Sequence, residues 1–275
     1  LVPLLQGQRP VVALSDYWGT RLVDSWQDLK YRPDFMCLND EVGADLVAKA
    51  WPDFDRTKIK ITGFPMLDNY CGKGKNKTVA RKNVFEKLGL DKDWPIVACP
   101  VGIFHGATKM LQEVMSALDG NVYFIPRYHP RMAENAPDEV GFWNETLTNY
   151  KNNGLIADSS ACKTPEVLEA ADVVISEFST SLLESAVMRI PTISVFYLSD
   201  AQKLFRKEFG DLMSEPPFVT LGLTYSPKNT AELKDTIRIA LNKGPANKDA
   251  QEDFIGRYVQ GKNAQRVADF VNSLI

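Results

Sequence analysis

Short apolar runs alternate with amphipathic stretches along most of the chain from Trp94 onward. Each run is about as long as a β-strand, and the runs cover residues 96–101, 122–126, 155–157, 172–176 and 191–196. The stretches between them keep their apolar residues on one helical face, as at 108–118, 164–171 and 179–188. Thr164 is expected as the N-cap of the second stretch, with Pro165 at the first helical position. Strands that alternate with helices predict a parallel sheet with helices on both faces.

The residues upstream repeat this pattern over a shorter length. Residues 10–16, 35–40 and 59–64 are expected to form strands, and 41–51 a helix. The pattern therefore predicts an α/β fold with two Rossmann-like domains, of which the first is incomplete. We expect a partial first domain at 1–66, a linker at 67–78, a second domain at 79–252, and a C-terminal helix at 253–275 that braces the first domain.

Three strands with one or two helices leave the edge of the first sheet open. We expect either a preceding segment or a second copy of the chain to cover this edge. The sequence begins with Leu1 instead of Met, which favours a piece of a longer protein, and residues 1–10 have no signal-peptide pattern.

Composition excludes several classes of protein. Of the 275 residues, 44% are hydrophobic, and 32 basic residues nearly balance 35 acidic ones, for a formal charge of −3. A general nucleic-acid or membrane-surface binder is usually basic, so we expect no nucleic-acid partner. No apolar run approaches the ~18 residues of a membrane span. The four cysteines are far apart, which favours free thiols and a cytoplasmic location. The basic positions 73, 75, 77, 81 and 82 are interpreted as a solvated face.

Candidate chemistry follows the strands of the second domain. In an open parallel sheet, ligands bind at the carboxyl ends of the strands, where helices begin. The residues placed there are small, polar or cationic, which suits a phosphorylated ligand: Gly102, His105, Arg127, His129, Arg131, Ser179, Thr180, Ser181 and Glu184.

Each candidate also has a purely structural interpretation. The hydroxyls of Ser179 to Ser181 can cap a helix without any ligand. Glu184 can be the carboxylate of a capping box, or it can accept hydrogen bonds from ribose hydroxyls. His129 can fill the core, although Arg127 and Arg131 on either side would be costly there. Glycines at 102 and 106 can allow a ligand to approach the backbone.

Several segments together resemble a known superfamily. Residues 61–68 (ITGFPMLD) are similar to the interdomain segment of GT-B-type glycosyltransferases and UDP-sugar 2-epimerases. Residues 170–195 resemble their donor-binding signature, and 258–271 their closing helix. The RYHPR sequence at 127–131 is similar to the His-Pro motif of CDP-glycerol glycerophosphotransferases.

The resemblance implies a nucleotide-activated donor bound between two domains, with no metal and no cofactor. Glu184 would hold the ribose, residues 179–181 the diphosphate, and His129 would assist the leaving phosphate. Asp16, after the first strand, is the acid placed to serve as catalytic base. The expected reaction transfers a sugar or polyol phosphate to a glycan or other hydroxyl acceptor, as in cell-surface polysaccharide synthesis. A 2-epimerase, or a binding protein without activity, is the alternative, although the loop after 96–101 lacks the epimerase H-R-x-E-N motif.

Overall fold

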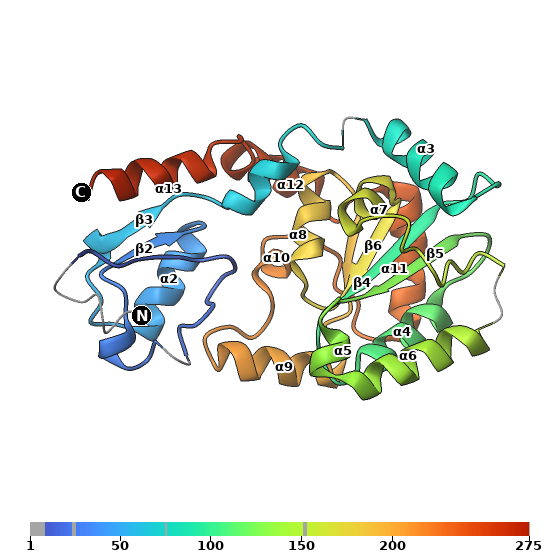
Figure 1. The fold of residues 1–275 in the computed structure, drawn as a ribbon, viewed down its shortest axis with the longest axis horizontal. Coiled ribbons are helices and arrows are strands. Elements are labelled where there is room, and N and C mark those ends of the chain that lie inside the picture. The colour runs from blue at the N-terminus through green and yellow to red at the C-terminus, as the bar shows by residue number, and fades with distance from the viewer. Residues whose placement is uncertain (1–8, 24–25, 75, 151–152, 275) are drawn as a thin grey trace. The chain divides into compact units, whose positions relative to one another are not determined.

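The structure is a computed structural model that describes residues 9–23, 26–74, 76–150 and 153–274 (Figure 1). The chain divides into two compact units. Unit 1 comprises Leu1–Cys71, Phe205–Pro217 and Asp253–Ile275, and unit 2 comprises Gly72–Leu204 and Phe218–Glu252. Each unit contains a parallel sheet flanked by helices, so the predicted α/β class is confirmed. The predicted cover for the edge of the first sheet stays a prediction.

Unit 2 is built on a four-stranded parallel sheet in the order β5-β4-β6-β7. Its strands are β4 (Ile96–Val101), β5 (Tyr123–Tyr128), β6 (Val173–Ser176) and β7 (Thr192–Ser194). The described α-helices of this unit are α3 (Lys77–Leu88), α4 (Ala107–Ala117), α5 (Met132–Asn135), α6 (Pro137–Asn149), α7 (Thr164–Ala170), α8 (Thr180–Val187), α10 (Pro217–Thr220, whose first residue is assigned to unit 1) and α11 (Thr230–Lys243).

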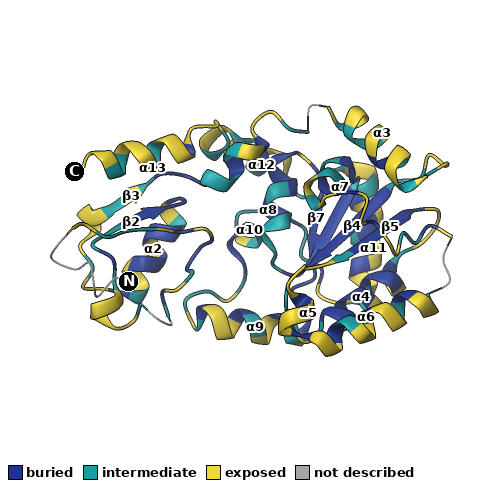
Figure 2. Ribbon diagram, in the orientation of Figure 1, coloured by how far each residue is buried: buried dark blue, intermediate teal, exposed yellow. Residues whose placement is uncertain are grey.

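Helices cover both faces of this sheet, and its two central strands, β4 and β6, are buried along their whole length (Figure 2). On one face the side chains of Val97, Cys99 and Val173 pack against α4, α6 and α11. On the other face α7 packs against β4 and α3, and α8 against β6 and β7. Burial on both faces explains why these strands appear in the sequence as continuous apolar runs.

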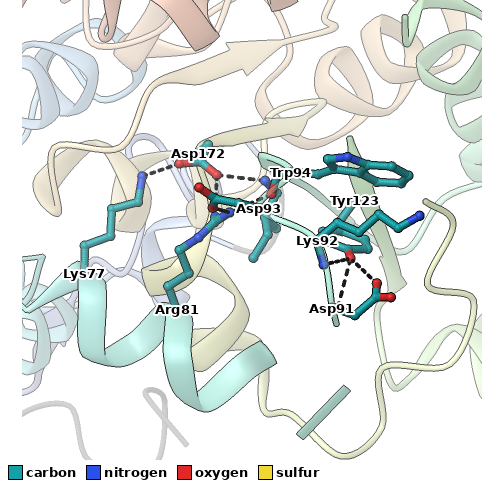
Figure 3. A network of polar contacts seen from close by, with 9 residues as sticks. Lys77, Arg81, Asp91, Lys92, Asp93, Trp94, Tyr123 and Asp172 are labelled. Atoms are coloured by element: carbon teal, nitrogen blue, oxygen red, sulfur yellow. Dashed lines mark hydrogen bonds and ion pairs between the residues drawn. The ribbon is translucent and has the colours of Figure 1, made fainter. Parts of the chain in front are cut away.

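An aspartate fixes the amino end of the sheet. Asp172 accepts the Ile96 N–H at 2.8 Å, and its two oxygens pair with Lys77 and Arg81 of α3, each at 2.8 Å (Figure 3). Arg81 also donates to the Trp94 carbonyl at 2.6 Å. The interpretation of these basic positions as a solvated face is therefore wrong for Lys77 and Arg81, while Lys82 is exposed and Lys75 lies outside the described residues.

Two other local predictions need correction. Residues 155–157 form no strand; Leu155 makes only an isolated bridge to Phe124. Helix α7 has Lys163 as its N-cap, with Thr164 and Pro165 in its first turn. The cap lies one residue earlier because the Glu166 carboxylate accepts the Lys163 N–H at 2.7 Å, which fixes the start of the helix there.

Unit 1 contains the parallel sheet β1-β2-β3, formed by Val12–Leu14, Phe35–Leu38 and Ile59–Ile61. Helix α2 (Glu41–Ala50) packs against β2 and β3. Helices α9 (Ser199–Phe209) and α12 (Lys248–Tyr258) begin in unit 2 and end in unit 1, and α13 (Asn263–Asn272) completes unit 1.

Helix α13 is attached to the segment after β3 by a buried asparagine. The Asn263 side chain donates to the carbonyls of Phe64 and Tyr258 and to the carboxylate of Asp68, at 2.7–3.0 Å. The Asp68 carboxylate also accepts the N–H groups of Asn263 and Ala264 at the start of α13. Gly63 has a φ of +84°, and a Cβ there would overlap the Asn263 amide, so this position requires glycine.

We expect Asn263→Ala to lower the free energy of unfolding of unit 1 by about 1–3 kcal/mol, because it leaves buried carbonyls without donors. Urea unfolding, combined with hydrogen exchange of the α13 amides, measures the loss. Asn272→Ala, at an exposed position of the same helix, is the control and should stay within about 0.5 kcal/mol of the wild type. Equal effects of the two substitutions would contradict this account.

Candidate functional site

The predicted site residues of unit 2 follow strands that are neighbours in the sheet. Strand β4 lies between β5 and β6, so the segments after these three strands leave the same edge of the sheet. Gly102 and His105 follow β4, the 127–131 segment ends β5, and residues 179–184 follow β6. Asp16 lies in unit 1, at an exposed position two residues after β1, and its catalytic role stays a prediction.

The 127–131 segment presents a histidine to solvent. Arg127 is half-buried and donates from Nη1 to both oxygens of Ser159 at 2.9 Å, and burial lowers the pKa of its guanidinium. His129 is exposed, so it does not fill the core. Its Nδ1 accepts the Arg131 N–H at 3.1 Å. A neutral His129 with this bond carries its proton on Nε2, which leaves Nε2–H available as a donor.

The start of α8 supplies a second polar group at this edge. Ser179 is the N-cap, and its Oγ accepts the Ser181 N–H at 3.3 Å. The capping interpretation of Ser179 is therefore confirmed. Glu184 lies at the fifth helical position, two residues beyond the position of a capping-box carboxylate, so that interpretation of Glu184 is wrong.

The loop after β4, residues 102–106, is held by two carboxylates that sequence reasoning did not select. Glu177 follows β6 and is 2% exposed; it accepts the Gly102 N–H at 2.8 Å and the Ser176 hydroxyl at 2.9 Å. Glu139 of α6 accepts the Gly106 N–H at 2.9 Å. A Cβ at position 102 would overlap Glu177, so this glycine makes room for a side chain of the protein itself. The position of Glu177, directly after a buried strand, could have indicated from the sequence that it holds this loop. No feature of the sequence indicated the same for Glu139.

A groove of about 680 Å³ lies between α4 and α6. Gly106 of the loop and Glu139 of α6 are among the residues that line it.

In the part of the chain that the structure describes, no group of three or more His, Cys, Asp and Glu side chains could hold a metal ion. Over the same residues, no helix is both long enough and apolar enough to span a membrane.

The family model of the CDP-glycerol:poly(glycerophosphate) glycerophosphotransferases matches residues 15–273. The chain belongs to this family. No curated protein sequence matches it. The family match confirms the predicted resemblance of the chain to the CDP-glycerol glycerophosphotransferases.

Solved structures with the same fold include a wall teichoic acid polymerase and UDP-GlcNAc 2-epimerases. The wall teichoic acid polymerase TagF aligns with 96% of this chain at 13% identity and a TM-score of 0.51, and the chain spans 66% of that protein. A UDP-GlcNAc 2-epimerase from Neisseria meningitidis, bound to UDP-GlcNAc, aligns with 96% of this chain at 12% identity and a TM-score of 0.62, with 70% of that protein covered. The corresponding enzyme from Methanocaldococcus jannaschii gives 14% identity and a TM-score of 0.60, with 94% and 68% covered.

The likeness to these structures shows the GT-B-like fold, and the family model identifies the glycerophosphotransferase family within it. The chain spans 56–66% of the TagF chains that it matches. The activity of a whole glycerophosphotransferase is therefore a proposal for this chain.

We expect Gly102→Ala to lower the free energy of unfolding by about 1–3 kcal/mol, because the added Cβ would displace the Glu177 carboxylate from the Gly102 N–H. Gly141→Ala is the matched control. Position 141 lies within α6, and a Cβ there would meet nothing within 4 Å, so this variant should gain about 0.5–1 kcal/mol. Thermal denaturation of both variants measures the difference. A stable Gly102→Ala protein would show that the Glu177 contact does not hold the loop.

Proposed function

We propose that unit 2 binds the nucleotide part of an activated donor and that the chain transfers a polyol phosphate or a sugar from this donor to a hydroxyl acceptor such as a glycan. One observation carries the proposal. The cationic 127–131 segment, which ends β5, and the Ser179-capped helix that follows β6 both lie at the carboxyl ends of the strands of one sheet. Membership of the glycerophosphotransferase family favours transfer over epimerisation.

The roles follow from the charges and donors of the site. The amides and hydroxyls at the start of α8, from Ser179 to Ser181, would hold the diphosphate, because a helix N-terminus favours an anion. Glu184, one turn further along the helix, would accept the ribose hydroxyls. The guanidinium groups of Arg127 and Arg131 would offset the remaining phosphate charge, and Gly102 and His105 would border the ligand.

In the chemical step, the leaving nucleotide phosphate is the group that most needs stabilisation. An acceptor oxygen forms a bond to the transferred group while the bond to the nucleotide phosphate breaks, and that phosphate takes up negative charge. The Nε2–H of His129 would donate to it, a stabilisation that strengthens as the charge develops. Asp16 would take the proton of the acceptor hydroxyl. The proposal needs no metal and no cofactor; the cytoplasmic location stays a prediction.

Nucleoside diphosphates such as UDP or CDP should raise the melting temperature without added metal. A ligand at about 100 times its Kd that binds only the folded protein adds about 2.7 kcal/mol to the free energy of unfolding. Thermal denaturation measures the shift, and the nucleosides uridine and cytidine serve as controls that lack the diphosphate. The donor-site proposal fails if no nucleotide at millimolar concentration shifts the transition, either with or without magnesium.

His129→Ala should keep its melting temperature within a few degrees of the wild type, because His129 is exposed. Donor hydrolysis or transfer should fall about 100-fold, with a much smaller change in donor affinity, because the lost hydrogen bond acts mainly in the transition state. Asn144→Ala, an exposed change on α6, controls for loss of a surface polar group. Unchanged turnover in His129→Ala would remove His129 from the mechanism.

A further inference from the structure

Two helices begin at the edge of the sheet where we place the donor, and their N-termini differ. Helix α4 follows β4, and α8 follows β6. Both present backbone N–H groups that favour an anion. Ser179 caps α8 with a neutral hydroxyl. At the start of α4, both oxygens of a carboxylate from another helix accept the backbone N–H groups.

That carboxylate is Glu139, in the first turn of α6. Its Oε1 accepts the Gly106 N–H at 2.9 Å. Its Oε2 accepts the Thr108 N–H at 3.0 Å and the Thr108 hydroxyl at 2.8 Å. Gly106 is the N-cap of α4, so Glu139 occupies the place where a bound phosphate would lie at a free helix start.

The carboxylate is well suited to remain there as an anion. Glu139 is 9% exposed. Burial acts to raise its pKa, but the hydrogen bonds from Thr108 and Gly106 outweigh it, with a smaller contribution from nearby His105, and the net pKa lies below the ordinary value. An ionised carboxylate repels a second anion at short range, and the more so where water is partly excluded.

The loop between β4 and α4 is thereby fixed at both ends. Glu177 holds Gly102, and Glu139 holds Gly106. Gly106 has a φ of +115°, and a Cβ there would lie 2.8 Å from the Cβ of Asp200, so this position requires glycine. Exposed His105 lies between the two fixed glycines.

We infer that Glu139 is a positioning residue: it serves as a built-in anion at the start of α4, holds the loop that carries His105, and thereby directs the ligand's phosphates to the start of α8. This inference rests on the proposed donor site. It predicts that the two helix starts are not equivalent toward phosphates because the protein supplies its own carboxylate to one of them.

The test uses inorganic pyrophosphate as the probe and isothermal titration calorimetry on the full chain. We expect the wild type to bind one pyrophosphate. Glu139→Ala should bind a second one, at the vacated start of α4, and this second binding should weaken as salt is added. Glu145→Gln removes the same charge from an exposed position of α6 and should keep the wild-type stoichiometry.

Glu139→Gln covers the case in which the alanine variant does not fold. Its side-chain amide fills the same place, but the negative charge that repels an anion is gone. The glutamine variant should therefore bind the second pyrophosphate that the wild type does not bind, although more weakly than Glu139→Ala binds it. A folded Glu139 variant with lower stability and unchanged pyrophosphate binding would overturn the inference and leave Glu139 a structural residue.

The same titrations separate this inference from the proposed function. If the wild type binds neither pyrophosphate nor any nucleoside diphosphate, the donor site is wrong. The directing role of Glu139 then fails with it, because no phosphate binds at the start of α8. If the variants gain a pyrophosphate that the wild type lacks, the blocked start of α4 is established independently of the donor.

Discussion

Backbone N–H groups at the ends of helices and strands need acceptors, and in this protein carboxylates supply several of them. An unpaired buried N–H costs as much as a lost hydrogen bond, and helices and strands leave such groups at their ends. The carboxylates that answer this need lie at the start of α2, α4 and α13 and at the two ends of β4: Asp40, Glu139, Asp68, Asp172 and Glu177. Part of the acidic content of the chain therefore does structural work inside the fold.

These carboxylates also determine which backbone amides of the candidate site are available to a ligand. A loop with two glycines beside a helix start suggests a phosphate cradle when only the sequence is known. In the structure the amides of Gly102 and Gly106 bind Glu177 and Glu139. The side chains of His105 in this loop and His129 after the neighbouring strand are exposed, and the hydroxyls at the start of α8 are half-buried. Strand order thus decides which segments share an edge, and carboxylates decide which amides remain for a ligand.

The elements of unit 2 could be predicted because burial leaves a strong pattern. Strand β4 has the predicted bounds, and β6 differs by one residue, since both are buried throughout and are mostly apolar. The 155–157 run was too short to distinguish a strand from a bridge. Long-range polar partners left no comparable pattern: Glu139 lies 33 residues from Gly106, and Asp172 lies 91 from Arg81. Residue types at the strand ends were therefore predictable, but their partners were not.

The Asn263 contact has a consequence for the order of folding during synthesis. It joins residues 195 positions apart, and unit 1 is assembled from three separate stretches of chain, with unit 2 encoded between them. A ribosome releases unit 2 in full before residues 253–275 emerge, and domains fold as units during translation. The β1-β2-β3 sheet therefore lacks α13 during the time in which the larger unit 2 folds. Nascent chains that stop before Asn263 would carry a folded unit 2 and a unit 1 without α13. Such an incompletely folded unit is what chaperones and proteases recognise.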